Sequence, residues 1–289
     1  MATPARNSAL LSLVTVVGLS ALALSSTASA APISFESAVL ADLPIAYWRF
    51  GETDTTTAMD SSGNGHHGTY TGGVTLGQPG IGGGDTAALF DGKSGRVTVP
   101  DDAGISPDHI TMEALVRWDG PNAFQQRILE KSWDDAETFT SYGLNVLPDG
   151  KVLVELETSG GDDSHYTTLA ALTVGESAHI VATFDGSTVL VYINGVLQVT
   201  DAGTGTLPAS GVILYDFSSL EALGLGNQAE RGRPFNGLID EIALYDYALS
   251  ADRVRDHAGI VPEPATVSLV GAGLIGLAAV LRRRGSRRP

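Results

Sequence analysis

The sequence contains no cysteine among its 289 residues. Disulfide bonds are therefore excluded, and the fold must be held by its apolar core, by hydrogen bonds and, where ligands allow, by a metal ion. Basic residues are also scarce: 17 lysines and arginines stand against 33 aspartates and glutamates, so the formal net charge is −16. A field of this sign repels phosphate and attracts divalent cations, which argues against nucleic acid as a partner.

Recognisable catalytic motifs are missing too. The sequence has no G-x-S-x-G elbow, no H-E-x-x-H helix and no phosphate-cradling glycine loop. Between residues 35 and 259 it has no internal repeat and no linker long enough to separate two domains. These absences predict a single domain and argue against an enzyme.

The first thirty residues have the pattern of an export signal. Arg6 precedes an apolar stretch over residues 9–24, and Ala28 and Ala30 are small residues of the kind that a signal peptidase accepts. We predict that residues 1–30 are a signal peptide, cut before Ala31.

An uncharged apolar run occupies residues 265–281 near the other end, and arginines follow it at positions 282, 283, 284, 287 and 288. As a helix, this run would span about 26 Å, close to the hydrocarbon thickness of a bilayer. Flanking basic residues stay on the cytoplasmic side, so the preceding body should lie outside. We predict a transmembrane helix over 265–281; the alternatives are a buried core helix and a disordered basic tail.

The triplet Pro262, Glu263 and Pro264 precedes this run, and the order of triplet, apolar run and arginines resembles the PEP-CTERM sorting signal of Gram-negative bacteria. The resemblance implies that residues 261–289 are recognised by an exosortase, a membrane-embedded cysteine protease that cuts near the triplet. The chain would then be held at the inner membrane only transiently before it is sorted to the cell surface or beyond. Since proline stops a helix from extending, the triplet should be extended and accessible.

The exported piece is more acidic than the whole chain. The two terminal segments contain six of the 17 basic residues and one of the 33 acidic residues. This leaves 11 basic and 32 acidic side chains, or about 21 net negative charges. Such a charge favours solubility and strengthens the argument against a nucleic-acid partner.

The body between these segments has the pattern of strands and turns, with apolar or β-branched runs at 45–50, 87–92, 95–100 and 142–147. Residues 110–118 alternate most clearly, which predicts a strand with one buried and one solvent-facing side. The predicted buried side holds Met112, Ala114, Val116 and Trp118, and the predicted solvent side holds Thr111, Glu113 and Arg117, broken only by Leu115.

Three short turns predict consecutive antiparallel hairpins: residues 148–150, 185–186 and 194–195. Many short strands without intervening helices predict two packed antiparallel sheets, a jelly-roll β-sandwich, with a closed barrel as the alternative. One late helix is predicted, capped by Ser250 and ending at Gly259.

Several segments resemble the LamG-like (concanavalin A-like) jelly-roll domain. They are AYWRFGE, DSSGNGHHGTYTGGVTLGQPG, AALFDG, ITMEALVRW, HIVATFDGSTVLVYINGV and FNGLIDEIALYDYALSADRV. The resemblance covers most of residues 31–259 and implies an all-β sandwich used in exported proteins mainly to bind carbohydrate or protein.

The turn over residues 60–65 is the best candidate for a metal site. Asp60 and Asn64 place oxygen-bearing side chains in a glycine-rich turn, much as an EF-hand loop begins, although its twelfth position is Thr71 rather than glutamate. The LamG-like resemblance implies that this turn meets Asp240, so that Asp60, Asp240 and backbone carbonyls would hold a structural Ca²⁺. The alternative is an Asx turn whose side chains bond only to the backbone.

A glycoside hydrolase is the enzymatic alternative, because jelly rolls of this kind include laminarinase-type enzymes. Glu155 and Glu157 lie two apart on one predicted strand face, about 7 Å between their Cα atoms. The aspartate expected between them is absent, and we expect both carboxylates to be solvated.

Carbohydrate recognition needs an exposed aromatic ring beside hydrogen-bonding groups. Trp133 is the best candidate because it lies in a polar stretch, with Arg231 and Arg233 as further ligand-binding candidates; Trp48 and Trp118 should be core. The sequence thus predicts an exported surface or matrix protein that binds a polysaccharide or a surface protein. The alternatives are a structural adhesion protein of the biofilm matrix and, less favoured, a hydrolase.

Overall fold

The computed structural model describes residues 34–81, 85–132, 140–202, 209–215, 222–228 and 232–261; of residues 161–163 and 202, only the backbone is described. The chain divides into two compact units, Met1–Pro32 and Ile33–Pro289. The first unit, with its predicted signal peptide, lies outside the described residues, as do Trp133, Arg231 and the predicted sorting segment from Pro262 onward.

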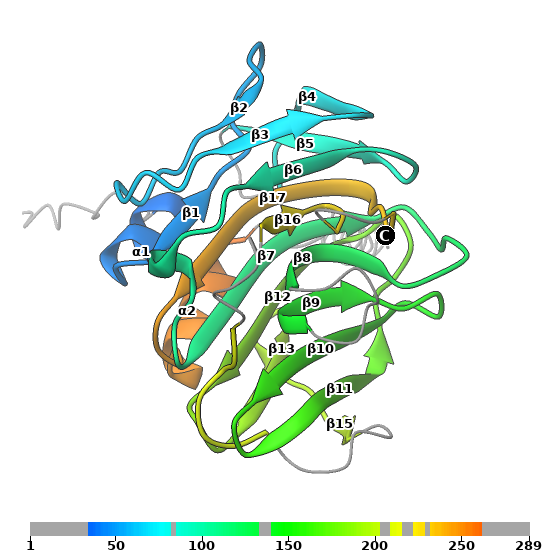
Figure 1. Ribbon diagram of the computed structural model, residues 1–289. Coiled ribbons are helices and arrows are strands. Elements are labelled where there is room, and N and C mark those ends of the chain that lie inside the picture. The colour runs from blue at the N-terminus through cyan, green and yellow to red at the C-terminus, as the bar shows by residue number, and fades with distance from the viewer. Residues whose placement is uncertain are drawn as a thin grey trace, which may run out of the picture. The chain divides into compact units, whose positions relative to one another are not determined.

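Two antiparallel sheets form a sandwich, as predicted (Figure 1). Across sheet A the described strands run in the order β14-β13-β12-β7-β17-β5-β4, and β1 also pairs with β17. These strands are β1 (Ala46–Trp48), β4 (Val74–Pro79), β5 (Thr86–Asp91), β7 (Ile110–Trp118), β12 (Ser177–Phe184), β13 (Val189–Ile193), β14 (Val196–Leu197) and β17 (Asn236–Tyr245).

Sheet B has the strand order β15-β11-β10-β9-β8-β16-β6-β3-β2 among the described residues, and Figure 1 shows most of it on the near side. Its strands are β2 (Thr57–Ala58), β3 (Gly68–Thr71), β6 (Arg96–Val99), β8 (Gln126–Ser132), β9 (Thr140–Val146), β10 (Lys151–Thr158), β11 (Gly161–Ala171), β15 (Thr200–Ala202) and β16 (Leu223–Leu225).

The three predicted hairpins are present: β9 pairs with β10, β12 with β13, and β13 with β14. In the last of these, Asn194 and Gly195 both have positive φ, 51° and 73°. Two consecutive positive φ angles suit a tight hairpin turn, and asparagine and glycine are the residues that adopt them most readily.

Two α-helices occur in the described part of the chain, together with the 3₁₀ turn η1 (Ala103–Ile105). Helix α2 (Ala251–Ile260) begins as predicted, with the Ser250 hydroxyl accepting from the Arg253 N–H, and ends one residue later than predicted. Helix α1 (Phe35–Ala41), capped by Ser34, was not predicted because seven residues are too few to show a helical period. No helix among the described residues is both long and apolar enough to cross a bilayer.

The main core lies between the sheets and includes the predicted buried side of β7. For the other side of β7 the prediction was wrong at Thr111 and Glu113, whereas Arg117 is half-exposed. Thr111, Glu113 and Leu115 are fully buried, because a second apolar cluster forms where helices α1 and α2 cover sheet A. Phe35 of α1 belongs to this cluster and meets His257 of α2 edge to face, 5.8 Å between ring centroids.

Candidate ligand-binding groove

Asp60 binds the backbone of its own turn and of strand β1. Its carboxylate accepts hydrogen bonds from the N–H groups of Tyr47, Ser62 and His66, each at 2.9 Å. Burial alone would raise the pKa of Asp60, but these hydrogen bonds outweigh it and lower the pKa. The contacts are those expected of an Asx turn, the alternative to a calcium ligand.

The other two predicted metal ligands have separate partners. The Asn64 side chain donates to the Ile45 carbonyl at 2.9 Å. Asp240 accepts from the Ile81 N–H at 2.7 Å and forms an acidic cluster with Asp85 and Glu241, whose ligand oxygens all lie within 4.8 Å of one another. Asp60 is not part of that cluster. The calcium site at Asp60, Asn64 and Asp240 stays a prediction.

Arg49 provides positive charge at the acidic cluster. Its guanidinium pairs with Asp85 and lies 3.7 Å from the Glu241 carboxylate. Glu241 sits at a bulge in β17 with φ of 51°, and its carboxylate accepts from the Tyr47 hydroxyl. Burial, reinforced by Asp240, raises the pKa of Glu241 to about 8 against the opposing effects of Tyr47 and Arg49.

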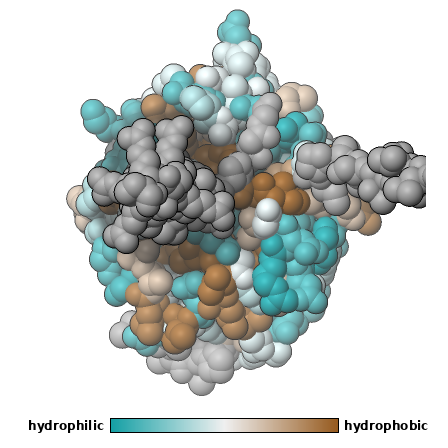
Figure 2. Space-filling model, turned by 180° about the vertical axis from the view of Figure 1, so that it is seen from behind, coloured by the Kyte–Doolittle hydropathy of each residue, from teal (hydrophilic) through white to brown (hydrophobic). Residues whose placement is uncertain are grey.

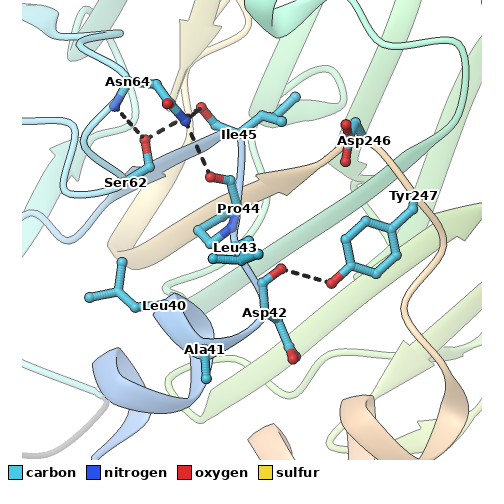
Figure 3. A pocket seen from close by; sticks show the side chains of 10 residues that line it. All are labelled: Leu40, Ala41, Asp42, Leu43, Pro44, Ile45, Ser62, Asn64, Asp246 and Tyr247. Carbon is cyan, nitrogen blue, oxygen red and sulfur yellow. Dashed lines mark hydrogen bonds between the residues drawn. The ribbon is translucent and has the colours of Figure 1, made fainter.

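A groove of about 620 Å³ opens where the chain leaves α1 and where it leaves β17 (Figure 3). It is lined by Leu40, Ala41, Asp42, Leu43, Pro44, Ile45, Ser62, Asn64, Asp246 and Tyr247. A second cavity, of about 530 Å³, shares Ile45, Asn64 and Asp246 with it and continues to His66, Asp102, Ala103, Gly104 and Pro107. We call the two together the rim groove. Each volume falls in the range of about 300–1,000 Å³ that is usual for small-ligand sites.

Tyr247 supplies the rim groove with a fixed and accessible aromatic ring. The side chain is 40% exposed, yet its hydroxyl donates to the Asp42 carbonyl at 2.8 Å, and its own carbonyl accepts from the Thr111 hydroxyl at 2.6 Å. The ring also packs edge to face against Tyr245, with centroids 5.9 Å apart. It is therefore held in place before any ligand arrives.

Most charged residues at the rim groove are acidic. Asp42, Asp102 and Asp246 line it, and no lysine or arginine is among its described lining residues, although Arg253 of α2 pairs with the Asp42 carboxylate at 2.9 Å. Ser62, Asn64 and His66 add groups that can donate or accept hydrogen bonds. Such a lining suits a neutral polyhydroxylated ligand and disfavours an anionic one.

Tyr247 was not predicted as a ligand-binding residue, because only the three tryptophans were considered as stacking rings. An available signal was its position between Asp246 and Ala248, directly after the last strand of the sandwich, where loops carry exposed binding residues. Asn64, predicted as a metal ligand, lines the groove.

Of the three predicted ligand-binding residues, only Arg233 is described. Its guanidinium lies over the Phe124 ring, 5.5 Å from the centroid, and it does not line the rim groove. Phe124 is well exposed, so this stacked pair is a second surface feature with aromatic and polar character. Its role in binding stays a prediction, as do those of Trp133 and Arg231.

The expectation that Glu155 and Glu157 are solvated was wrong, since they are only 6% and 2% exposed. Glu155 pairs with Arg127, accepts from the Asn145 side chain at 2.6 Å and lies 3.5 Å from the His165 ring. Arg127 also pairs with Glu130, whose pKa is raised to about 7 because burial and Glu155 outweigh the lowering by Arg127. Two carboxylates thus share one guanidinium on sheet B.

Comparison with known families agrees with the fold. A family model for the concanavalin A-like lectin/glucanases superfamily matches residues 91–255, more than half of the chain. The chain belongs to this superfamily. A second model, for the PEP-CTERM protein-sorting motif, matches residues 261–284, which indicates export and surface sorting in a Gram-negative bacterium. A comparison with curated proteins found no match.

Solved structures with this fold include carbohydrate-active proteins. Domain 4 of AbnA, an extracellular arabinanase from Geobacillus stearothermophilus solved with arabinotriose, is 22% identical over 74% of this chain and 98% of its own, with a TM-score of 0.52. The binding domain of Paraclostridial Mosquitocidal Protein 1 is 15% identical over 76% and 52%, with a TM-score of 0.58. Trypanosoma rangeli sialidase is 13% identical over 73% and 31%, with a TM-score of 0.52. At these identities the likeness is one of fold.

Proposed function

We propose that this protein is an exported carbohydrate-binding protein that holds a neutral oligosaccharide in the rim groove. The observation that carries this proposal is the fixed, half-exposed ring of Tyr247 beside hydrogen-bonding side chains in a groove whose described lining holds three aspartates and no lysine or arginine. A pyranose or furanose ring has apolar C–H surfaces that stack on an aromatic face, while its hydroxyls need polar neighbours. The arabinotriose complex of the AbnA domain is consistent with this class of ligand.

Export and processing belong to the same proposal. The signal peptide would direct residues 31 onward across the inner membrane, the apolar run at 265–281 would hold the intermediate there, and an exosortase would cut near Pro262, Glu263 and Pro264. The mature domain would then act at the cell surface or in the surrounding polysaccharide. A calcium ion at Asp60 and Asp240 would have a structural role in such a protein.

We also propose that the domain binds its glycan without cleaving it. Glu155 is engaged by Arg127, Asn145 and His165, and Glu157 is buried. An inverting or retaining glycosidase needs two carboxyl groups that reach a substrate and act as separate acid and base or nucleophile. The rim groove, where a substrate could enter, is lined by neither glutamate.

Affinity chromatography on neutral and acidic polysaccharides tests the binding proposal. We expect the protein to be retained on arabinan or a neutral glucan but not on alginate, and Tyr247→Ala to weaken the affinity about tenfold, because a stacking surface worth about 1.4 kcal/mol is lost. Phe124→Ala is the matched control, since Phe124 is also exposed but lies outside the groove.

Other outcomes would redirect the proposal. Binding that survives Tyr247→Ala but is lost in Phe124→Ala would move the site to the Phe124 and Arg233 surface, and loss in Trp133→Ala alone would support the sequence prediction for that residue. Absence of binding to every glycan, with the protein found in the biofilm fraction, would favour the structural matrix role. Release of reducing sugar that stops in Glu155→Gln would identify a hydrolase.

A further inference from the structure

Exposed aliphatic residues gather at one edge of the sandwich. Leu197 of β14 and Val199, which follows it, are 52% and 69% exposed, and Leu169 of β11 is 60% exposed. The Leu169 N–H donates to the Val199 carbonyl at 3.0 Å, which brings the two segments side by side, and we call these three residues the edge strip. Figure 2, seen from behind, shows hydrophobic residues at several places on this face, including its lower part. Exposed apolar residues that lie together often mark a surface that contacts a membrane or another protein.

The edge strip lies next to the helix from which the sorting segment departs. A Cβ built on Gly195, directly before β14, would come within 2.9 Å of the Ala258 side chain and 3.4 Å of the Arg255 backbone. Helix α2 ends at Ile260, and Val261 packs against the second apolar cluster. The sorting motif begins at this same residue 261, so the motif follows the folded domain with no intervening linker.

The connection to the apolar run is therefore very short. Only residues 261–264 separate the end of α2 from the run that starts at residue 265. Fully extended, four residues span about 14 Å, and the headgroup layer of one leaflet takes up about 5–7 Å of that. The end of α2 must then lie within about 10 Å of the lipid headgroups as long as the sorting segment is attached and in the membrane.

We propose that the edge strip rests on the lipid surface while the protein is anchored. The tether keeps the strip at high effective concentration near lipid, so weak apolar contacts suffice to orient the domain. A second copy of the chain would have to be recruited from solution or by lateral diffusion, whereas lipid is already within reach. The inference rests on the anchored intermediate of the proposed function.

This orientation leaves the rim groove open. Arg253 of α2 binds the Asp42 carboxylate at 2.9 Å on the groove side, whereas Arg255 and Ala258 face Gly195. At about 100° per residue, positions 255 and 258 lie on the flank opposite to 253. When the strip contacts lipid, the side of α2 that carries Arg253 and borders the rim groove therefore faces away from the membrane, toward the surrounding polysaccharide.

Site-specific fluorescence on the full-length chain tests the orientation. Because the chain has no cysteine, the variants Leu197→Cys and Leu43→Cys each carry a single thiol for an NBD label. Both leucines are exposed, but Leu43 lines the rim groove, so it is the matched control. The protein is reconstituted into vesicles of phosphatidylethanolamine and phosphatidylglycerol, with and without a doxyl-labelled lipid.

We expect the label at residue 197 to shift to the blue and to be quenched by the doxyl lipid at least twofold more than the label at residue 43. Val199→Cys should repeat the result at a second position of the strip. Equal exposure of both labels to water, or stronger quenching at residue 43, would overturn the proposal. A blue shift at residue 197 without doxyl quenching would assign the strip to a second copy of the chain instead.

Flotation of the same vesicles tests membrane anchoring separately from lipid contact of the edge strip. If the chain does not float with the vesicles, the anchor itself fails and the lipid contact fails with it. If the chain floats but the label at residue 197 stays in water, only the edge-strip proposal fails.

Discussion

At the scale of single residues, Asp60 fixes a loop through hydrogen bonds from the backbone. Its two oxygens accept from three backbone N–H groups, one on strand β1 and two in the turn. This turn carries Ser62, Asn64 and His66 to the rim groove. Asp60 therefore positions the groove although it does not line it.

We expect Asp60→Ala to lower the free energy of unfolding by about 3 kcal/mol, because charge-assisted hydrogen bonds to a mostly buried carboxylate are lost. Urea denaturation measured in EDTA and again in millimolar calcium distinguishes the two interpretations of this residue. Equal losses in both conditions support the turn, and a loss that appears only with calcium supports the metal site. Asp149→Ala, in an exposed hairpin turn, should cost less than about 1 kcal/mol.

At the scale of secondary-structure elements, helix α2 is joined to sheet A by a buried polar contact. Glu113 of β7 accepts from the rings of His179 and His257 at 2.6 and 2.9 Å and from the Tyr245 hydroxyl at 2.7 Å. Burial opposes its ionised form, but these partners outweigh burial and hold the pKa of Glu113 well below its usual range. The carboxylate is thus a charged centre on which two strands and a helix converge.

Glu113→Ala should destabilise the domain by about 3–5 kcal/mol, because three buried donors lose their acceptor at once. Chemical denaturation gives the size of the effect, and amide exchange in α2 shows whether this helix loosens first. Glu176→Ala, which removes an exposed glutamate, should stay within about 0.5 kcal/mol of the parent protein. A similar small loss for Glu113→Ala would contradict the role given to this contact.

At the scale of the whole molecule, the buried titrating groups change the folding stability with pH in two opposite directions. Glu241 and Glu130 have pKa values raised to about 8 and about 7, chiefly by burial, and hydrogen bonding and attraction to Glu113 raise the pKa of His257 against burial. Each of these groups holds its proton more tightly in the folded state, so each contributes stability that is lost as pH rises. Asp60 and Glu113 act in the opposite direction, and their contribution is lost in acid.

We therefore expect the protein to be more stable at pH 6 than at pH 9, measured as melting temperature. The stability that Glu241 contributes is lost between pH 4.5, its ordinary pKa, and about pH 8, its pKa in the folded protein. Glu241→Gln imitates the protonated form, so it should raise the melting temperature at pH 9 by more than it does at pH 6. Glu176→Gln is the control, and a melting temperature that rises steadily from pH 6 to pH 9 would contradict the expectation.

Local patterns in the sequence were enough to predict the sandwich, the three hairpins and helix α2. Alternation along residues 110–118, the Asn194–Gly195 pair and the Ser250 cap each act through neighbours in the chain, so their effect can be inferred without knowing the fold. The same holds for the sorting signal, which is defined by the order of a triplet, an apolar run and arginines.

Tertiary packing alone decided which polar residues are buried and where the groove lies. Glu113 faces α1 and α2 rather than water, because elements distant in sequence pack over it. Glu155 of β10 meets Arg127 of β8 across strand β9, which lies between them. The rim groove likewise joins the segment after α1, the Asp60 turn and the end of β17. Local periodicity records how each segment alternates, whereas the surroundings of a side chain depend on which segments the fold places beside it.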